Sequence, residues 1–381
     1  MFFVDQAVRE AIEMVDQGEN KTMEIFDNCS KKSFIDLGYE ENIKNVHEIF
    51  QMYEARGFLY PQKKQMLGDH LSFIEKNWSR AIDQRLINII AFKGQDNSFD
   101  ASVVEWRTVG GGWLYQHLVA NQNPWASYCV MRGTCFESEF EKRSKQNWFR
   151  PNNKYANKLF GSAVDTIGGD RSVVISYAYL KAKRIILNYE AVSCVTVHGV
   201  DANRAGEFRA FVVSQRGMVF AMAEEITETD EDWELSRVNV DYENAGLFRR
   251  RHIVLAVDKR RDCIVGVGLV YRGPLGLNFS FIENRLDLIV DFNLDKEMRV
   301  DVARALLDAS FQYYSDFELD WIPLVVDNAS IDDFGHGVDY LRDYKQLIWL
   351  QSGFNLFGAH LDKFYKKIIT RWESKREFGN V

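Results

Sequence analysis

The sequence contains little proline, no paired cysteines and no long apolar run. Only 5 of its 381 residues are proline, which argues against linkers and disordered tracts. Its 5 cysteines are odd in number and form no Cys-x-x-Cys pair. That pattern predicts reduced thiols in a cytoplasmic protein rather than a disulfide framework. No stretch approaches the roughly 20 apolar residues of a membrane-spanning helix, and the early acidic residues are not those of a signal peptide.

Positive charge is also in deficit. The formal net charge is −8 and the isoelectric point is about 5.5. Because binding to a nucleic-acid backbone needs clustered positive charge, nucleic acid is not expected as the main partner. The basic run Arg249, Arg250 and Arg251 adjoins an apolar segment and is typical of a solvated strand end.

The motifs of several common enzyme classes are missing. The chain contains no Gly-x-Ser-x-Gly, His-Glu-x-x-His, EF-hand or P-loop pattern, which removes the familiar hydrolase and metal-site interpretations. No metal is therefore expected. The run of Gly110, Gly111 and Gly112 leaves two alternatives open, a hairpin turn or a close backbone approach to a ligand.

The remaining composition is typical of a soluble globular protein. Hydrophobic residues make up 46% of the chain and charged residues 27%. A chain of 381 residues exceeds what one hydrophobic core usually supports. Two domains are therefore expected.

The first part of the chain is predicted to begin with helices and continue with strands. Apolar residues at helical spacing predict helices over residues 4–16, 43–55 and 63–82. A Gly, Asp and Asn turn between two β-rich runs then predicts a hairpin. The predicted strands are residues 86–92, 99–106, 110–120, 125–131 and 172–180, with a helical segment from 136 to about 160 before the last of them.

The second part is predicted to alternate between strands and helices. Asp201 is the predicted N-cap of a helix that stops at Arg216 and Gly217. The other predicted elements are strands at 184–197, 253–257, 263–271, 286–292 and 321–327, and helices at 296–315 and 338–351.

An internal repeat links the two parts. A helix ending in Arg-Gly occurs at Arg56 and again at Arg216, an offset of 160, and the hairpin of residues 89–106 matches 254–271 at an offset of 165. Such self-similarity decides a whole fold. The sequence therefore predicts two similar α/β (α+β) units, each a mixed, largely antiparallel sheet with helices on both faces. The expected organisation is a helical extension at 1–40, a first domain at 41–190 and a second at 191–381.

The order helix, helix, three strands, helix, strand, helix, strand resembles the GNAT (GCN5-related N-acetyltransferase) family of N-acyltransferases. The last helix of that family commonly ends in an aromatic residue, three further residues and Gly-Phe, and this chain has Trp349, Gly353 and Phe354 at that spacing. The resemblance covers residues 200–370 and, more weakly, 40–185. It implies tandem GNAT-like domains and transfer of an acyl group from acetyl-CoA or a longer acyl-CoA to the amine of a small molecule or a protein.

The resemblance also implies where the acyl donor would bind. GNAT enzymes hold the pyrophosphate of acyl-CoA on backbone amides before the third helix, where glycines allow close approach and a helix N-terminus favours an anion. The matching junction at residues 291–301 has no glycine and several acids, which would repel phosphate. Residues 130–142 offer a better cradle, so the predicted donor-binding residues are Arg132, Gly133 and Thr134.

Candidate catalytic residues follow from the same resemblance. The amine needs a base and the leaving thiolate an acid; where the family often has a proton-donating tyrosine, this chain has Trp349, whose indole cannot protonate a thiolate. The predicted bases are His117, Glu283 and Asp291, and the predicted acids are Tyr128, Tyr340 and Tyr344. Because both family motifs are degraded, a non-catalytic binding or scaffold protein with the same fold is kept as the alternative.

Overall fold

The computed structural model describes most of the chain. It covers residues 34–35, 38–94, 97–121, 123–136, 141–183, 194–227, 232–327, 334 and 337–378, without the side chains of residues 62 and 375–378. The predicted opening helix at residues 4–16 and the predicted domain boundary at 190 lie outside the described residues.

A single sheet forms the centre of the molecule. Its 12 strands lie in the order β1-β2-β3-β4-β5-β12-β6-β11-β10-β9-β8-β7. In chain order the strands are β1 (Tyr39–Glu40), β2 (Ile87–Lys93), β3 (Phe99–Arg107), β4 (Gly112–Ala120), β5 (Ser144–Phe149), β6 (Ser172–Lys183), β7 (Val195–Gly199), β8 (Arg250–Asp258), β9 (Cys263–Arg272), β10 (Leu286–Val290), β11 (Trp321–Val326) and β12 (Val338–Leu350).

The sheet order is symmetrical about its centre. Counted inward from either edge, β1 to β5 and then β12 occupy the same places as β7 to β11 and then β6. The parallel pairs β4–β5 and β10–β11 correspond, and the other neighbours are antiparallel. Strand β2, with residues 89–92, and strand β8, with residues 254–257, therefore hold equivalent positions, as the sequence repeat predicts.

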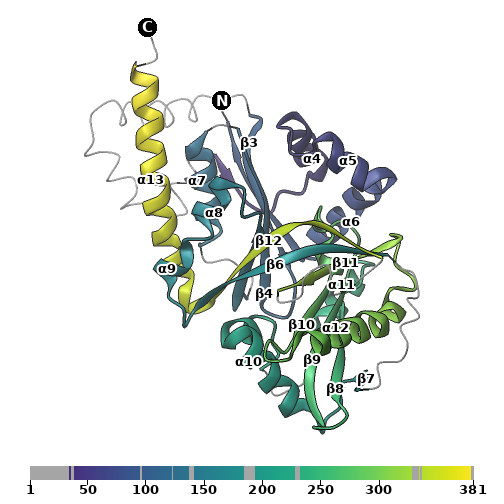
Figure 1. Cartoon of the computed structure of the whole chain (residues 1–381). Coiled ribbons are helices and arrows are strands. Elements are labelled where there is room, and N and C mark those ends of the chain that lie inside the picture. Colours follow the sequence, from purple (N-terminus) through teal and green to yellow (C-terminus); the bar gives the residue numbers. More distant parts are fainter. Residues whose placement is uncertain are drawn as a thin grey trace.

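The two central strands are exchanged between the halves of the chain. Strand β6, from the first half (residues 38–183), pairs with β11, and β12, from the second half (residues 194–378), pairs with β5. The two also pair with each other over most of their length, from Val338–Ala182 to Trp349–Ser172. Figure 1 shows them crossing the middle of the molecule side by side. Each half thus completes its sheet with a strand from the other.

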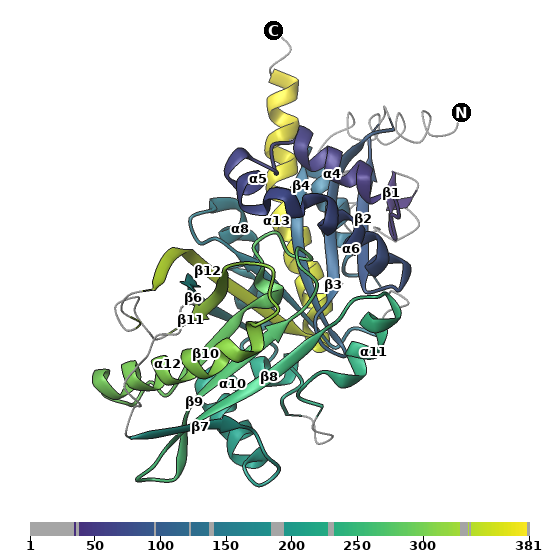
Figure 2. The same cartoon turned by 90° about the vertical axis from the view of Figure 1, so that its right-hand side faces the viewer.

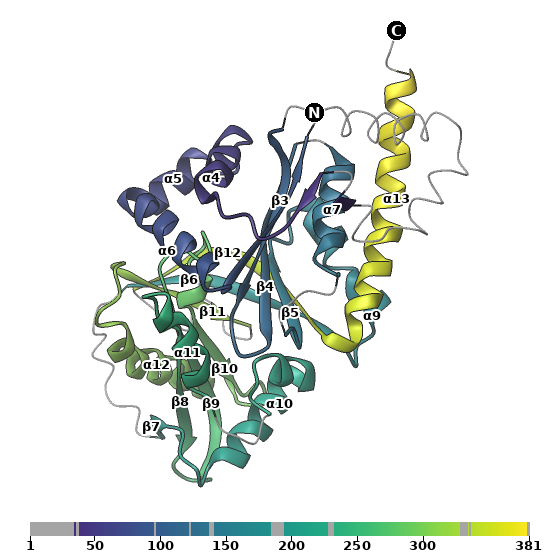
Figure 3. The ribbon, with the colours of Figure 1, turned by 180° about the vertical axis from the view of Figure 1, so that it is seen from behind.

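Helices cover both faces of the sheet. In the first half, α4, α5 and α6 lie on one side of β2 to β4, and α7 and the long C-terminal α13 lie on the other (Figure 3). In the second half, α10 and α12 lie on opposite sides of β8 to β10 (Figures 1 and 2). The helices are α4 (Val46–Ala55), α5 (Pro61–Leu67), α6 (Leu71–Asp83), α7 (Pro124–Gly133), α8 (Lys154–Leu159), α9 (Ala163–Ile167), α10 (Ala205–Ala223), α11 (Ser236–Asn244), α12 (Lys296–Ser310) and α13 (Phe354–Phe378).

Residues 125–131 form helix α7, so the strand predicted there is wrong. The side chain of Asn123 accepts hydrogen bonds from the backbone N–H groups of Trp125 and Ala126, and Pro124 occupies the first helical position. An Asn cap followed by proline is a helix-start signal. It outweighs the β-propensity of the aromatic and branched residues that follow.

Two other predicted helices are also corrected. Residues 338–350 form strand β12, which pairs with a neighbour on both sides, and residues 144–149 of the predicted helical segment form strand β5. Gly353 therefore follows a strand and precedes α13, and it does not adopt a positive φ. A Cβ at Gly353 would lie 2.6 Å from the side chain of Ile167. Close packing, rather than a helix cap, requires glycine there.

The connection between β9 and β10 reaches into the first half. This segment, the crossing loop (residues 273–285), buries Leu275 and Leu277 completely. The indole of Trp78 on α6 donates to the carbonyl oxygen of Gly276 at 2.9 Å. The side chain of Gln116 on β4 donates to the carbonyl oxygen of Leu277. The crossing loop therefore fills the space between α6 and β4.

The three-glycine run makes the reciprocal contact. It forms the turn from β3 into β4, and the N–H groups of Gly110 and Gly111 donate to the carboxylate of Glu225 at 3.0 and 2.7 Å. A Cβ at Gly110 would lie 2.6 Å from that carboxylate. The close backbone approach that the sequence left open is therefore made to a side chain of the second half.

Within the residues that the structure describes, no helix is long and apolar enough to cross a membrane.

The crossing loop makes a stability prediction at Gly276. Its φ is +82°, and a Cβ there would lie 2.2 Å from Ile74. Gly276→Ala should therefore lower the free energy of unfolding by about 3 kcal/mol, combining backbone strain with overpacking. Gly57, with φ +68° and nothing within 4 Å of its Cβ, is the matched control, and Gly57→Ala should cost only about 1 kcal/mol. Urea unfolding measures both; equal losses would contradict a role for the packing.

Candidate functional site

The two parallel strands of the first half pair over only part of their length. Strand β4 pairs with β5 from Gly112 and Ser144 to Tyr115 and Asn147. Beyond Tyr115, β4 continues to Ala120 without a partner on that side. The register of β4 against β3 also shifts there, and His117 has a φ of +54°. A β-bulge therefore lies where β4 and β5 separate. Such bulges often change the direction in which a side chain points.

His117 lies on the α4–α6 face of this opening, in an aromatic stack. Its ring is stacked with Trp78 and with Phe279, with centroids 5.5 and 4.2 Å away. The N–H of Phe279 donates to Nε2 of His117 at 3.3 Å. Burial, followed by the charge of Lys63, holds the pKa of His117 well below its usual range. The imidazole is therefore neutral and its Nε2 lone pair is occupied.

Three cationic side chains gather beside this stack. They are Lys63 on α5, Arg150 directly after β5 and Arg342 on β12. All three act on Tyr60 or on one another, and they form the cation cluster. The Nζ of Lys63 lies over the ring of Phe58, 3.6 Å from its centroid. Burial, together with the charges of Arg150 and Arg342, lowers the pKa of Lys63 to about 7. In the part of the chain that the structure describes, the cluster makes no ion pair with a carboxylate.

Two phenols and a serine border the cation cluster. Arg150 donates to the hydroxyl of Tyr60 at 3.0 Å, and the hydroxyls of Tyr344 and Ser280 lie 2.9 Å apart. Burial raises the pKa of Tyr60, but Arg150 and Arg342 more than offset it, so that this pKa lies below its usual value. The cluster thus combines cations with hydroxyl groups from α5, β12 and the crossing loop.

The second half has the opposite electrostatic arrangement at the equivalent place. Asp327 directly follows β11, as Arg150 follows β5. Arg216 on α10 contacts both Asp327 and Asp287, at 3.0 and 2.9 Å. Arg216 and Asp287 are almost completely buried, and Asp327 is partly buried. The cation here is therefore neutralised by carboxylates of the chain itself.

The basic run at 249–251 belongs to the same buried network. Arg249 and Arg251 are 1% and 0% exposed, so the predicted solvated strand end is wrong for these two residues. Arg249 donates to the carbonyl oxygens of Thr108 and Glu283 at 3.0 and 2.8 Å, and Arg251 contacts Glu224 at 3.5 Å. A guanidinium with five donors suits such multiple contacts. Arg249 thereby ties the turn after β3 to the crossing loop.

The predicted donor-binding residues lie at the C-terminal end of α7. Arg132 contacts Asp362 of α13 at 3.1 Å. A Cβ on Gly133 would lie 2.2 Å from the ring of Tyr39, and the hydroxyl of Thr134 donates to the carbonyl oxygen of Met131. A helix C-terminus carries partial negative charge. Arg132 and Gly133 therefore pack α7 against its neighbours, and Thr134 closes the C-terminal turn of α7.

The predicted catalytic residues do not all come together. Tyr344 shares the α4–α6 face with His117 and borders the cation cluster. Tyr128 lies on the opposite face, where its hydroxyl donates to Asp362 at 2.9 Å. Glu283 is fully buried within the crossing loop, where its carboxylate accepts from the N–H of Gly276 at 2.6 Å. Asp291 accepts from the N–H of Asn293, and Tyr340 is 49% exposed.

Neither helix after the fourth strand of a half fits the pyrophosphate of acyl-CoA. At α7 the first helical residue is Pro124, and the next two N–H groups are capped by Asn123. At α12 the N-cap is Asp295, whose carboxylate accepts from the N–H of Met298 at 2.8 Å. Phosphate would meet occupied donors at the first helix and negative charge at the second. Neither of these two helix starts therefore offers the family's phosphate cradle.

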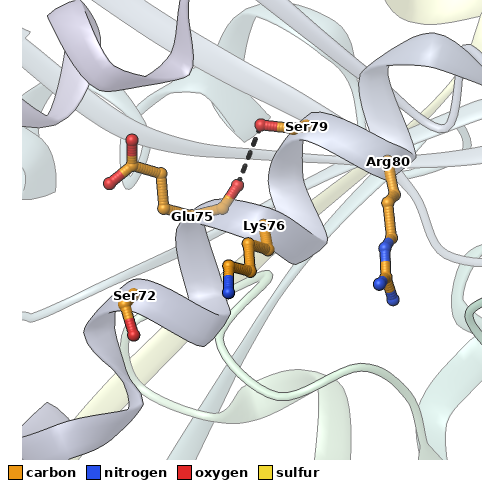
Figure 4. A pocket seen from close by; sticks show the side chains of 5 residues that line it. All are labelled: Ser72, Glu75, Lys76, Ser79 and Arg80. Atoms are coloured by element: carbon orange, nitrogen blue, oxygen red, sulfur yellow. Dashed lines mark hydrogen bonds between the residues drawn. The ribbon is translucent and has the colours of Figure 1, made fainter.

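Two further searches, for a surface hollow and for metal ligands, do not point to a reactive site. A shallow surface hollow of about 480 Å³ is lined by one side of α6, with residues Ser72, Glu75, Lys76, Ser79 and Arg80. Figure 4 shows its charged side chains pointing apart rather than converging. Among the described residues, no group of three or more His, Cys, Asp and Glu side chains could hold a metal ion.

No protein-family model matches the sequence, and no curated protein matches it. Solved structures do match. A tandem GNAT protein from the clavulanic acid biosynthesis pathway is 7% identical and covers 82% of this chain and 98% of its own, with a TM-score of 0.41. A GCN5-related N-acetyltransferase from Sphaerobacter thermophilus is 11% identical, covers 82% and 95%, and has a TM-score of 0.39. A glucosamine N-acetyltransferase region of a fungal multi-domain β-N-acetylglucosaminidase is 8% identical, covers 82% and 38%, and has a TM-score of 0.44.

The element order of the chain itself decides the fold. The first half runs through two helical segments, β2, β3, β4, α7, β5, two short helices and β6, and the second half follows the same order as far as β11. In both halves the strands flanking the third helix are parallel. The protein has a tandem GNAT-like fold. Its first half holds the partly opened strand pair and the cation cluster.

Sequence reasoning missed the members of the cation cluster. Lys63 lies in a predicted helix, Arg150 in a segment predicted as helical, and Arg342 in a helix that is in fact strand β12. One signal was available for Lys63, because its neighbours Phe58, Tyr60 and Pro61 form an aromatic and rigid entry to α5. The other two become visible only through strand pairing.

The lowered pKa of Lys63 makes the stability of the protein depend on pH. Between about pH 7 and 10.5 the unfolded chain holds a proton on Lys63 that the folded chain has lost, so stability rises with pH. Relative to Lys63→Met, the wild-type free energy of unfolding should rise by about 1 kcal/mol per pH unit across this window. Urea unfolding at pH 7 and 9.5 measures it, with exposed Lys64→Met as the control. Parallel curves for wild type and Lys63→Met would contradict a buried, destabilised ammonium.

Proposed function

We propose that the protein is an N-acyltransferase that transfers an acyl group from a thioester, with acyl-CoA as the donor to test first, to an amine. The supporting observation is the opening between β4 and β5 in the first half, with a bulge at His117 and Lys63 beside it. In a GNAT-like sheet, parting of these two strands creates a cleft for a thioester. Backbone N–H groups at a bulge can then polarise its carbonyl.

Lys63 is the proposed base. Near neutral pH a lysine with a pKa of about 7 is partly uncharged and can accept a proton. The amine nitrogen attacks the thioester carbonyl, the new C–N bond forms as the C–S bond breaks, and the amine proton passes to Nζ of Lys63. His117, whose Nε2 already accepts from Phe279, serves as a neutral wall of the opening and positions the aromatic stack.

Tyr60 is the proposed acid. Its hydroxyl accepts a hydrogen bond from Arg150, and its lowered pKa makes it a stronger acid than an ordinary phenol. It would protonate the leaving thiolate and be restored by exchange with solvent, since Tyr60 is half-exposed. Tyr344, beside Ser280, is the nearest alternative. The acceptor is an amine on a small molecule or a protein.

The alternative is a non-catalytic protein that uses the GNAT-like fold as a binding or scaffold module. The observation that favours it is the lack of a phosphate cradle at α7 and α12, where Pro124, Asn123 and Asp295 occupy the helix starts. Filling of the space beside β4 by the crossing loop agrees with it. The two functions make opposite predictions for turnover.

The test is direct detection of an amide product. Purified protein is incubated with acetyl-, hexanoyl- or palmitoyl-CoA and a panel of amino acids, polyamines and lysine peptides, and mass spectrometry identifies new amides. Lys63→Met should lower kcat/KM by about 100-fold or more and remove the rise of kcat/KM with pH around 7. Tyr60→Phe should lower kcat with little change in KM.

Lys64→Met is the matched control, because Lys64 is an exposed neighbour that pairs with Glu54. Its activity should equal that of the wild type. A folded wild-type protein that yields no amide from any donor and amine, and shows no thermal shift with any acyl-CoA, would refute the proposal and favour the scaffold.

A further inference from the structure

We infer that the cation cluster, Lys63, Arg150 and Arg342, is a binding site for the oxyanion group of a small molecule, a phosphate or a carboxylate. This inference rests on charge and geometry, so it stands whether or not the protein transfers acyl groups.

The cation cluster is electrostatically unfavourable without a bound anion. Like charges repel, and partly buried charges lose hydration. Lys63 is only 9% exposed, its Nζ lies 5.5 Å from the centre of the Tyr60 ring, and the hydroxyl of that ring accepts from Arg150 at 3.0 Å. The charges of Arg150 and Arg342 also lower the pKa of Lys63. Among the described residues none of the three is paired with a carboxylate. A bound anion would offset this repulsion and turn an unfavourable arrangement into a favourable one.

The ammonium, guanidinium and hydroxyl groups at the cluster suit an oxyanion. Guanidinium groups donate two parallel hydrogen bonds to carboxylate or phosphate, and an ammonium group adds a point charge. Tyr60 and Tyr344 supply hydroxyls at the border of the cluster. Arg150, Arg342 and Tyr60 are half-buried rather than sealed. A small ligand can therefore reach the donors from solvent.

The second half neutralises the cation at the equivalent position with its own carboxylates. At the equivalent end of β11 the chain supplies its own carboxylates, and Arg216 contacts Asp287 and Asp327. The same fold can thus neutralise a cation internally. In the first half the residue after β5 is Arg150 instead of an acid, and the counter-charge is left to a ligand.

A purely structural role for the cluster is the competing explanation. Lys63 lies over the rings of Phe58, Tyr60 and Phe279, and cation–π contacts can stabilise a lysine without any ligand. Such a cluster would gain nothing from an added anion. Measuring anion binding therefore distinguishes a ligand-binding site from a purely structural cluster.

The experiment is titration of the full-length protein with sulfate, which keeps its charge between pH 6 and 9. Calorimetric titration and thermal unfolding are followed at constant ionic strength, with chloride as the reference. Sulfate should raise the unfolding temperature more than chloride does. Arg150→Gln, Arg342→Gln and Lys63→Met should each weaken sulfate binding at least tenfold. Lys64→Met and Arg56→Gln, whose cations pair with Glu54 and Asp100 outside the cluster, should bind as the wild type does.

A second readout needs no variant that might fail to fold. Because Lys63 loses its charge as the pH rises, sulfate affinity of the wild type should fall between pH 6 and 9. Lack of any sulfate response beyond that of chloride would overturn the inference. So would sulfate binding that survives in the Arg150→Gln/Arg342→Gln double variant.

The source of the anion is distinguished by two further probes. Adenosine 3′,5′-bisphosphate represents the phosphates of a CoA donor, and glycine and glutamate represent an amino-acid acceptor. The probe that competes with sulfate and loses affinity in Arg150→Gln and Arg342→Gln identifies the class. Competition by neither, with sulfate still bound, assigns the cluster to an oxyanion of another small molecule.

Discussion

The antiparallel pairing of β6 with β12 is the contact on which the rest of the structure depends. Each strand lies between the other and the fifth strand of the opposite half, so the pair closes what would otherwise be two exposed edges at β5 and β11. Unpaired edges invite aggregation. Each half is completed by a strand of the other, the largest buried apolar cluster contains residues of both halves, and α13 packs on α7.

The same pairing assembles the candidate site. Arg342 and Tyr344 reach the end of β5 only because β12 lies beside it, with Lys345 opposite Phe149. The crossing loop contributes Ser280 and Phe279 from the second half. The site is therefore built from α5, β5, β12 and the crossing loop, which are far apart in sequence. The arrangement of these residues therefore depends on the exchange of strands as well as on local packing.

The two halves share a fold but differ in electrostatics. The buried network around Arg216, Arg249 and Arg251 satisfies its cations with carboxylates and backbone carbonyls of the chain. Breaking such a network leaves a buried charge without a partner, which suits a structural role. The first half instead keeps a cation cluster, without a carboxylate partner among the described residues, beside a partly opened strand pair. The buried charge network of the second half thus suits a structural role, whereas the first half holds the candidate site.

The sequence by itself determined the repeat, the hairpins β2–β3 and β8–β9, and the order of elements that resembles GNAT proteins, because period-two and helical apolar patterns are local signals. It also showed that acids precede α12. It misjudged α7, where a cap outweighs β-propensity, and β12, whose strand conformation is imposed by neighbours on both sides. The positions of Arg132, of the buried arginines and of the cation cluster were decided by tertiary structure alone. Burial and charge proximity depend on which distant strands pair, and no local pattern records that choice.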